Sequence, residues 1–362
     1  MIFDPKVLPL GVSLSFKFDP LSTYVRTVMK VALSGVDSRD GALLSKVKKT
    51  LESLNVKTQI MMDDEYHAAT QVDLVLVAGG DRGILDYFHK VVTDSAPVLG
   101  IYETDSTGFL SQLEVRDLEF ATSRLKRGDY SVDKVFRLAV KVDGRPVDPV
   151  LNDVAVFPSK SATLMEHVLR IDGNDVWHDK SDGVIVSTPT GSTAYSMSAG
   201  GPMVMQKAPV FLIVSVNSLD NTRRPLVVPN DSVLEVADIA SRYHCEVVLD
   251  GGRRQQVKNM LECSKHEFPA RLVRMAGDSS AASLMAKKVK LSEDMLKMPP
   301  SAKLILKTLE YEGALSQKDL ASRTMLPERT IRLSLSHLLS QGYVKKKTSL
   351  RDARQRIYEL KI

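Results

Sequence analysis

Residues 182–202 have the sequence DGVIVSTPTGSTAYSMSAGGP, in which an apolar segment, Val184–Val186, leads directly into small and hydroxyl-bearing residues. Consecutive β-branched residues ahead of a proline and a glycine predict a buried strand that ends in a loop. Small residues let backbone amides approach a ligand closely, and hydroxyl groups can donate hydrogen bonds to phosphate or ribose oxygens. An ordinary polar loop between two strands is the usual meaning of such a composition, but the length of this run favours a binding loop.

The residues that precede this stretch alternate between strand and helix patterns. We expect a strand at 30–35, a helix with Leu43, Leu44, Val47, Leu51 and Leu54 on one face, a strand at 72–78, and a strand at 97–101 followed by a loop at 103–108. The strand at 72–78 ends in Gly79-Gly80-Asp81. Open α/β sheets bind ligands at the carboxyl ends of their strands, so residues 29–130 are predicted to form an α/β nucleotide-binding domain.

Short β-rich runs separated by turn residues begin at about residue 130. They cover 134–142, 155–157, 166–171, 183–187, 211–216, 232–236 and 246–249. This pattern is typical of an all-β, sandwich-like domain, which we place at 131–277. Because Met29 is followed at once by a strand-like segment, we treat residues 1–28 as a leader that the fold does not need.

A third unit is expected at the C-terminal end of the chain. Residues 278–300 are rich in Ser, Ala and Lys and are expected to form a short helix and a linker that ends at Pro300. Residues 301–362 follow the order helix, helix, turn, helix and two strands, with Gly313 and Gly342 as helix ends and Ser316 as an N-cap. This order resembles the winged helix-turn-helix, a small α+β module of many archaeal and bacterial regulators.

The composition, with 43% apolar and 26% charged residues, is that of a soluble globular protein. The apolar runs are too short to span a bilayer and the N-terminus lacks a signal-peptide pattern, so we expect a cytoplasmic protein. Cys245 and Cys263 have no metal-type spacing and are expected to be reduced core residues. From Lys297 onward, 14 Lys and Arg stand against 6 Asp and Glu, which predicts a separate, anionic partner for this end.

That partner is expected to be duplex DNA, with the helix from Glu328 to Gln341 in the major groove. Its apolar residues Ile331, Leu335, Leu338 and Leu339 would pack inward, which directs Arg329, Arg332 and Ser336 outward. The remaining candidate DNA contacts are the basic residues of the hairpin, namely Lys345, Lys346, Lys347, Arg351, Arg354 and Arg356. A protein–protein or dimerisation module is the alternative for this unit.

The stretch at 188–202 resembles the TPTGSTAYSLSAGGP signature of NAD kinases nearly residue for residue, and the resemblance extends from about Met29 to Glu293. It implies transfer of a phosphoryl group from ATP or polyphosphate to the 2′-hydroxyl of NAD, which gives NADP. The resemblance, together with the tail, is to the archaeal type of this family with a fused winged helix-turn-helix. It also implies a homo-oligomer, and Mg²⁺ as the ion that accompanies ATP; no residue cluster has the spacing of a protein-held metal site.

The family's GGDGT motif corresponds to Gly79-Gly80-Asp81-Arg82-Gly83. The resemblance implies that Asp81 is the general base and that Gly79, Gly80, Arg82 and Gly83 bind the phosphates of ATP. Phosphoryl transfer depends mainly on such positioning and on electrostatic stabilisation. The alternative for Asp81 is a turn residue that caps the next helix.

The NAD side of the site is implied by a second group of matching positions. The family's Asn-Glu motif corresponds to Asn152-Asp153, in which the shorter acid keeps its capacity to accept hydrogen bonds. Arg223–Pro229 resembles a family segment that we interpret as structural. The other positions that the resemblance assigns to NAD binding are Thr163, Lys180, Asp182, Thr193, Ala194, Tyr195 and Ser198.

The ATP side departs from the family pattern. Arg82 and Gly83 stand where the family has glycine and threonine, and Gly252 stands where it often has an amide. The loop at 103–108 also lacks the family's asparagine and first internal glycine. Arg82 could either crowd the phosphate path or bind a phosphate itself.

A sensor is the main functional alternative: a transcriptional regulator whose kinase-like body binds NAD or NADP without turnover. Lipid kinases of the diacylglycerol type share the GGDG element, but they lack the run at 188–195. A dehydrogenase is disfavoured because no G-x-G-x-x-G opens a helix after the first strand.

Overall fold

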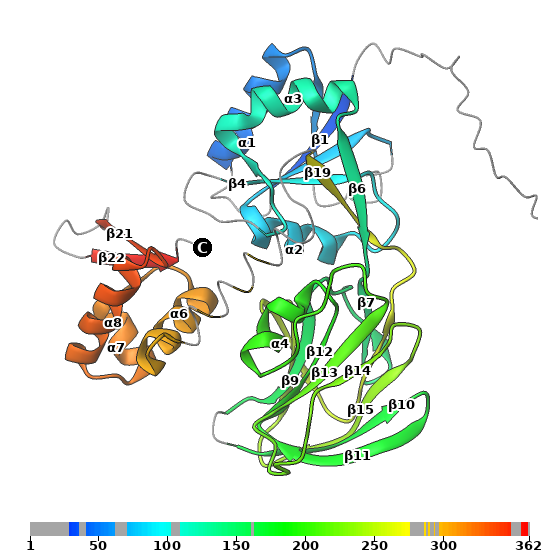
Figure 1. Cartoon of the computed structure of the whole chain (residues 1–362), viewed down its shortest axis with the longest axis vertical. Helices are drawn as coiled ribbons and strands as arrows, with labels where there is room; N and C mark the ends of the chain where they lie inside the picture. Colours follow the sequence, from blue (N-terminus) through cyan, green and yellow to red (C-terminus); the bar gives the residue numbers. More distant parts are fainter. Residues whose placement is uncertain are drawn as a thin grey trace, which may run out of the picture.

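The computed structural model describes residues 29–35, 41–61, 71–102, 109–160, 163–275, 297–348 and 356–360, with isolated positions between 286 and 293. The predicted leader at 1–28, the loop at 103–108 and most of the linker at 278–300 lie outside the described residues. Figure 1 shows an α/β domain, a β-rich domain and a small C-terminal module as separate units.

The first domain is an open sheet with strand order β2-β1-β3-β4-β19-β6, and β5 also pairs with β4. Its central strands are parallel, as an α/β sheet requires. Helices α1 and α3 share a core with one face of the sheet, whereas α2 packs on the other face. The elements are β1 (Lys30–Ser34), α1 (Gly41–Ser53), β2 (Lys57–Ile60), β3 (Leu74–Ala78), α2 (Gly80–Lys90), β4 (Val98–Tyr102), β5 (Leu113–Glu114), the 3₁₀ turn η3 (Val115–Asp117), α3 (Leu118–Arg127), β6 (Tyr130–Val135) and β19 (Ala270–Met275).

Two strands of this sheet come from the segment that was assigned to the second domain. The expected run at 134–142 divides at Phe136-Arg137 into β6 and β7 (Leu138–Val142), and only β7 belongs to the β-rich domain. The strand β19 returns from the second domain and pairs with β4 and β6. Val273 and Met275 of β19 lie in one core of the first domain and Ala270 and Leu272 in the other, so burial on both faces holds the strand there.

The second domain is a sandwich of two six-stranded antiparallel sheets, β11-β10-β15-β18-β7-β8 and β14-β13-β12-β9-β16-β17. Apolar residues from both sheets form its one large core, as expected for a β-rich domain. Its further elements are β8 (Arg145–Pro146), β9 (Asp153–Pro158), β10 (Met165–Ile171), β11 (Asn174–Ser181), β12 (Gly183–Ser187), the 3₁₀ turn η4 (Gly191–Thr193), α4 (Tyr195–Ser198), β13 (Val210–Val216), β14 (Leu226–Pro229), β15 (Leu234–Ser241), β16 (Cys245–Leu249), β17 (Arg253–Val257) and β18 (Leu261–Lys265).

The C-terminal module has its own apolar core, which includes Ile305, Leu320, Leu335 and Tyr358. The second helix begins with the predicted N-cap: Ser316 accepts the N–H of Asp319, and Asp319 accepts the N–H of Ser316 in a capping box. The elements are α6 (Pro300–Glu312), β20 (Leu315–Ser316), α7 (Gln317–Thr324), α8 (Glu328–Ser340), β21 (Val344–Thr348) and β22 (Arg356–Leu360), with strand order β20-β22-β21.

Within the described residues, no helix is long and apolar enough to cross a membrane. Both cysteines are buried and free. Burial raises the pKa of the Cys245 and Cys263 thiols, which keeps them protonated and unreactive.

Candidate functional site

The ends of three neighbouring strands bring the central residues of the site together. In the sheet, β9 lies between β12 and β16, with Asp153 opposite Ser187 and Val154 opposite Leu249. The start of β9, the end of β12 and the end of β16 therefore meet at one edge. Asn152-Asp153, the loop that follows Ser187, and Asp250 all lie at this edge.

Asp250 organises the edge through its carboxylate. It accepts the backbone N–H groups of Leu151, Asn152 and Asp153 at 3.0, 2.7 and 3.1 Å. On the other side, Oδ2 lies 3.3 Å from Nε2 of His89 on α2. Burial lowers the pKa of His89, and the charge of Asp250 acts in the opposite direction; burial also raises the pKa of the Asp250 carboxyl, which the three backbone N–H groups and His89 oppose. No sequence motif indicates this pair, because its members are far apart in the chain.

The loop after β12 is held by its own hydroxyl groups. Thr188 donates to the carbonyl of Leu151 at 2.6 Å, and the Ser192 hydroxyl donates to the carbonyl of Pro189 at 2.8 Å while it accepts the N–H of Val204 at 3.1 Å. These hydroxyls, which the sequence suggested as ligand donors, are buried and serve the loop. A β-carbon on Gly191 would overlap the backbone of Asn152, so only glycine permits this approach.

Most of the predicted NAD-binding residues near Asp250 and the loop after β12 are at least partly exposed, and Asp153 is the buried exception. Asn152 is half-buried, and no hydrogen bond of its side-chain amide is found among the described residues. Asp153 is buried, and its Oδ2 accepts the N–H of Tyr195 at 3.4 Å. The ring of Tyr195 packs on Phe157 with centroids 5.6 Å apart. Thr193, Ala194 and Tyr195 are half-buried and Ser198 is exposed.

Lys180, Asp182 and Thr163 lie at the opposite end of β12. Asp182 directly precedes the first residue of β12, whereas Ser187 is its last, so about 17 Å of extended strand separates this group from Asn152. Lys180 is exposed and forms an ion pair with Glu166 at 2.7 Å, and Asp182 accepts a hydrogen bond from Asn217 at 2.8 Å. Within one chain the structure does not bring these two groups together.

The Gly-Gly-Asp turn joins β3 to α2. Gly79 and Gly80 have φ of 106° and 66°, a backbone region that favours glycine. Asp81 follows in the first turn of α2, and its carboxylate accepts the N–H groups of Phe109, Leu110 and Ser111 at 2.8, 2.9 and 2.8 Å. Asp81 therefore holds residues 109–111 against the start of the helix.

Gly83 has a packing role that the sequence did not indicate. Its N–H donates to the carbonyl of Gly79 at 3.1 Å, and a β-carbon at this position would overlap the carbonyl oxygen of Ala78. The Gly83 amide is thus used inside the helix, and a threonine here would force α2 away from β3. Of the predicted phosphate-binding residues, only Gly79, Gly80 and Arg82 remain candidates for contact with a phosphate.

Arg274 on β19 is a cation near Asp81 that sequence analysis missed. It is buried, and its Nε donates to Asp133 at 3.2 Å. Burial lowers the pKa of Arg274, while the charges of Asp133 and Asp81 act in the opposite direction. The Arg274 guanidinium thus lies within electrostatic reach of Asp81 as well as of Asp133.

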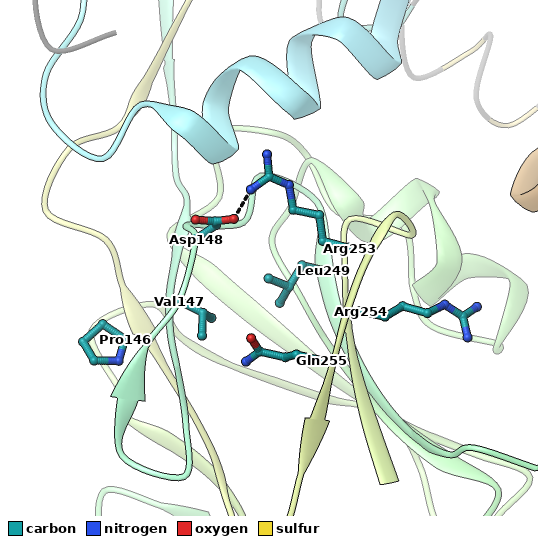
Figure 2. Close-up of a pocket in the computed structure, with 7 residues that line it drawn as sticks. All are labelled: Pro146, Val147, Asp148, Leu249, Arg253, Arg254 and Gln255. Carbon is teal, nitrogen blue, oxygen red and sulfur yellow. Dashed lines mark hydrogen bonds and ion pairs between the residues drawn. The ribbon is translucent and has the colours of Figure 1, made fainter. Parts of the chain in front are cut away.

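A cavity of about 370 Å³ lies beside the β16–β17 turn. Figure 2 shows Asp148 and Arg253 paired at its upper end, below the ribbon of α2. Its lining is formed by Pro146, Val147, Asp148, Leu249, Arg253, Arg254 and Gln255. The part of the chain that the structure describes contains no group of three or more His, Cys, Asp or Glu that could hold a metal ion.

The fold is similar to that of two solved phosphotransferases. One is an NAD kinase from Archaeoglobus fulgidus in complex with ATP, at a TM-score of 0.60 and 24% identity over 72% of this chain and 99% of that chain. The other is a yeast NADH kinase complexed with NADH, at a TM-score of 0.60 and 21% identity over 73% of this chain and 86% of that chain. The chain thus has the two-domain fold of these kinases.

The sequence comparisons narrow the class. The family model for the ATP-NAD kinase N-terminal domain matches residues 25–130, and the model for the C-terminal domain matches residues 151–275. NAD kinases of Methanopyrus kandleri and Alcanivorax borkumensis are 34% and 35% identical over 56% and 57% of this chain and 73% and 70% of their own lengths. The chain belongs to the NAD kinase family.

Proposed function

We propose that the protein transfers a phosphoryl group from ATP to the 2′-hydroxyl of NAD, with polyphosphate as the alternative donor. One observation carries the proposal: the strand edge with Asn152 and Asp153 is tied, through Asp250 and His89, to the helix that begins at the Gly-Gly-Asp turn. An acceptor bound at that edge and a donor bound at that turn would meet near Asp81.

The residues at this junction have distinct proposed parts. Gly79 and Gly80 offer backbone amides to the donor, and Asp81 accepts the proton of the attacking hydroxyl. Asn152, Asp153 and Tyr195 hold the acceptor. Because the described residues offer no carboxylate cluster for a metal, Mg²⁺ would be bound chiefly by the phosphate oxygens of ATP, where it neutralises developing charge.

The direct test is to incubate the purified full chain with ATP, Mg²⁺ and NAD and to measure NADP. Polyphosphate in place of ATP tests the second donor. Formation of NADP with either donor supports the proposal. If NAD binds but neither donor gives NADP, the protein is the NAD- or NADP-sensing regulator instead. Arg82 and the altered sequence at 103–108 are the features that favour that candidate.

We further propose that the protein is a homo-oligomer in which Lys180 and Asp182 of one copy complete the site of another. The separation of this group from Asn152 along β12 supports this proposal. So does the surface around it: β11 is an edge strand, and Leu164 and Leu219 are 41% and 65% exposed beside it. Sedimentation of the full chain measures the oligomeric state.

For the C-terminal module we propose a winged helix-turn-helix that binds duplex DNA, fused to a cytoplasmic kinase of the archaeal type. The element order α6-β20-α7-α8-β21-β22 supports it. On α8, Ile331 and Leu335 are buried while Arg329, Arg332 and Ser336 are exposed, which leaves a polar face for the major groove.

The basic hairpin offers fewer unpaired cations than expected. Lys345 and Lys347 both form ion pairs with Glu359, at 3.1 and 2.5 Å. Lys346 and Arg356 are exposed, and Arg351 and Arg354 lie outside the described residues. A dimerisation module stays the alternative, and binding of the full chain to duplex DNA at low salt separates the two.

A further inference from the structure

One face of helix α2 carries three polar residues that are directed toward the second domain. Arg82, Asp86 and His89 follow at intervals of four and three residues and so share a face of the helix. His89 contacts Asp250, the first residue of the turn between β16 and β17. Arg82, near the start of the helix, lies against Gly252 of the same turn.

The contact between Arg82 and Gly252 depends on the absence of a side chain. A β-carbon on Gly252 would lie within 3.0 Å of Cζ and Nη1 of Arg82, and closer still to Nη2. The guanidinium thus occupies the space that any other residue at 252 would fill. Nε of Arg82 donates to Asp86 at 3.1 Å, which fixes the direction of the side chain.

The rest of the Arg82 guanidinium is available to a ligand. Among the described residues, no hydrogen bond or ion pair is found for Nη1 or Nη2, and the side chain is 57% exposed. These two nitrogens carry four N–H donors in a planar fork, which matches two oxygens of a phosphate group. They lie on the residue that follows Asp81, close to where the reaction is proposed to take place.

We propose that Gly252 is a positioning residue that leaves room for Arg82 to cross between the domains, and that Arg82 so placed binds a phosphate group of the phosphoryl donor. The inference rests on the proposed function for the identity of that ligand. It assigns a cause to two departures from the family pattern, because an arginine at 82 and a larger residue at 252 cannot both keep this geometry.

Backbone strain does not account for the glycine at position 252. Its N–H donates to the carbonyl of Leu249 at 3.0 Å, and its φ lies outside the left-handed region, in contrast to Gly251 at 67°. The three atoms nearest to an added β-carbon all belong to Arg82. An alanine at 252 would therefore clash with the Arg82 guanidinium, and Arg82→Ala should remove that clash.

A four-protein cycle tests the inference: wild type, Arg82→Ala, Gly252→Ala and the double variant. The measured quantities are the dissociation constant for inorganic tripolyphosphate, which carries phosphates without adenosine, and the KM for ATP. Arg82→Ala should raise both the dissociation constant for tripolyphosphate and the KM for ATP by about tenfold or more. Gly252→Ala should also raise both constants, because it displaces the guanidinium. The double variant should show constants no higher than those of Arg82→Ala alone.

Gly41→Ala serves as the matched control, because a β-carbon there meets no atom within 4 Å. If the factors of the two single variants multiply in the double variant, the two positions act independently and the inference is wrong. Tighter binding or faster turnover of Arg82→Ala would also overturn it, since the arginine would then obstruct the donor. Tripolyphosphate binding is measured without turnover. If the chain makes no NADP but the effects of Arg82→Ala and Gly252→Ala on tripolyphosphate binding are coupled, the proposed function is wrong and the inference about Arg82 and Gly252 stands.

Discussion

Nε2 of His89 lies 3.3 Å from Oδ2 of Asp250, and this contact joins the two domains at the centre of the candidate site. The C-terminal end of the same helix is held by Arg137, whose Nη2 donates to the carbonyls of Phe88 and Val91 at 2.8 and 2.6 Å. Helix α2 is thereby fixed relative to residues 151–153. The Asp250 carboxylate thus contributes both to the contact between the domains and to the placement of residues 151–153.

We expect Asp250→Ala to lower the free energy of unfolding by about 3 kcal/mol or more, because it leaves three backbone N–H groups without their acceptor. NAD affinity should fall as well, since Asn152 and Asp153 lose their anchor. Urea unfolding and NAD titration measure the two effects.

Asp143→Ala is the matched control for this variant. Asp143 also accepts three consecutive backbone N–H groups, from Lys258, Asn259 and Met260, but in an exposed turn away from the site. Water can replace the lost acceptor there, so a smaller loss of stability and an unchanged NAD affinity are expected. Equal effects of the two variants on NAD affinity would show that Asp250 does not position the acceptor residues.

Asp81→Asn should lower the rate of NADP formation by at least about a hundredfold, the scale of a lost general base. The same change also disturbs three hydrogen bonds to residues 109–111, so the melting temperature must be followed with the rate. Glu119→Gln, an exposed acid in the first turn of α3, is the control. If the variant loses much stability but its folded fraction keeps most of kcat, Asp81 has a structural role, through its hydrogen bonds to residues 109–111, and is not the general base.

The sequence predicted local structure well where hydrophobic runs are bounded by turn residues. The strand at 183–187 was predicted with the bounds that β12 has, and Ser316 was predicted as an N-cap, which the structure confirms. The strand β19 was not among the predicted β-rich runs, and apolar residues on both of its faces would show only that a strand is buried, not in which sheet it lies. The division at Phe136-Arg137 was missed because both residues fit a β pattern.

The membership of the candidate site stays a prediction from the motifs, whereas the arrangement of its residues comes from the structure. A motif assigns Asn152 and Asp182 to one site, yet only the register of β9 with β12 shows that they lie at opposite strand ends. His89 was missed because no short motif surrounds it. Arg82 was singled out as a departure, but its relation to Gly252 depends on how two domains meet.

The proposed oligomer predicts complementation between two inactive variants, Asn152→Ala and Asp182→Ala. When the two are co-expressed and mix at random, a site built from two copies is fully wild type in about a quarter of cases. Activity should therefore return to about a quarter of the wild-type value. If activity stays at the level of the separate variants, the proposed shared site is wrong. Either both residues then belong to the site of a single chain, or Asp182 does not belong to the site.

His167 predicts how stability depends on pH. It is 2% exposed, and burial lowers its pKa to about 4, with Asp179 acting in the opposite direction. The unfolded chain binds this proton near pH 6.5 and the folded chain only near 4, so stability is constant above about 6.5 and falls as the pH drops. At pH 5 the loss is about 2 kcal/mol.

His167→Leu should remove that part of the pH dependence. Urea unfolding at pH 7 and pH 5 measures the difference in unfolding free energy between wild type and variant. The change in packing caused by leucine contributes equally at both pH values, so it drops out when the two differences are compared. The exposed His178, changed in the same way, is the control. A difference that does not change between the two pH values would mean that His167 titrates normally in the folded protein.

The C-terminal module should bind duplex DNA with an affinity that falls steeply with salt, with a log–log slope of about −0.9 for each phosphate contact. Arg354→Ala with Arg356→Ala should weaken binding to all sequences and flatten this slope, because hairpin side chains contact phosphates. Arg332→Ala on α8 should instead reduce the ratio of specific to non-specific binding, because outward residues of that helix reach base edges. Arg145→Ala, an exposed arginine on β8 of the second domain, is the control and should change neither quantity. Absence of DNA binding by the full chain at low salt, combined with loss of self-association when residues 297–362 are removed, would assign the module to dimerisation.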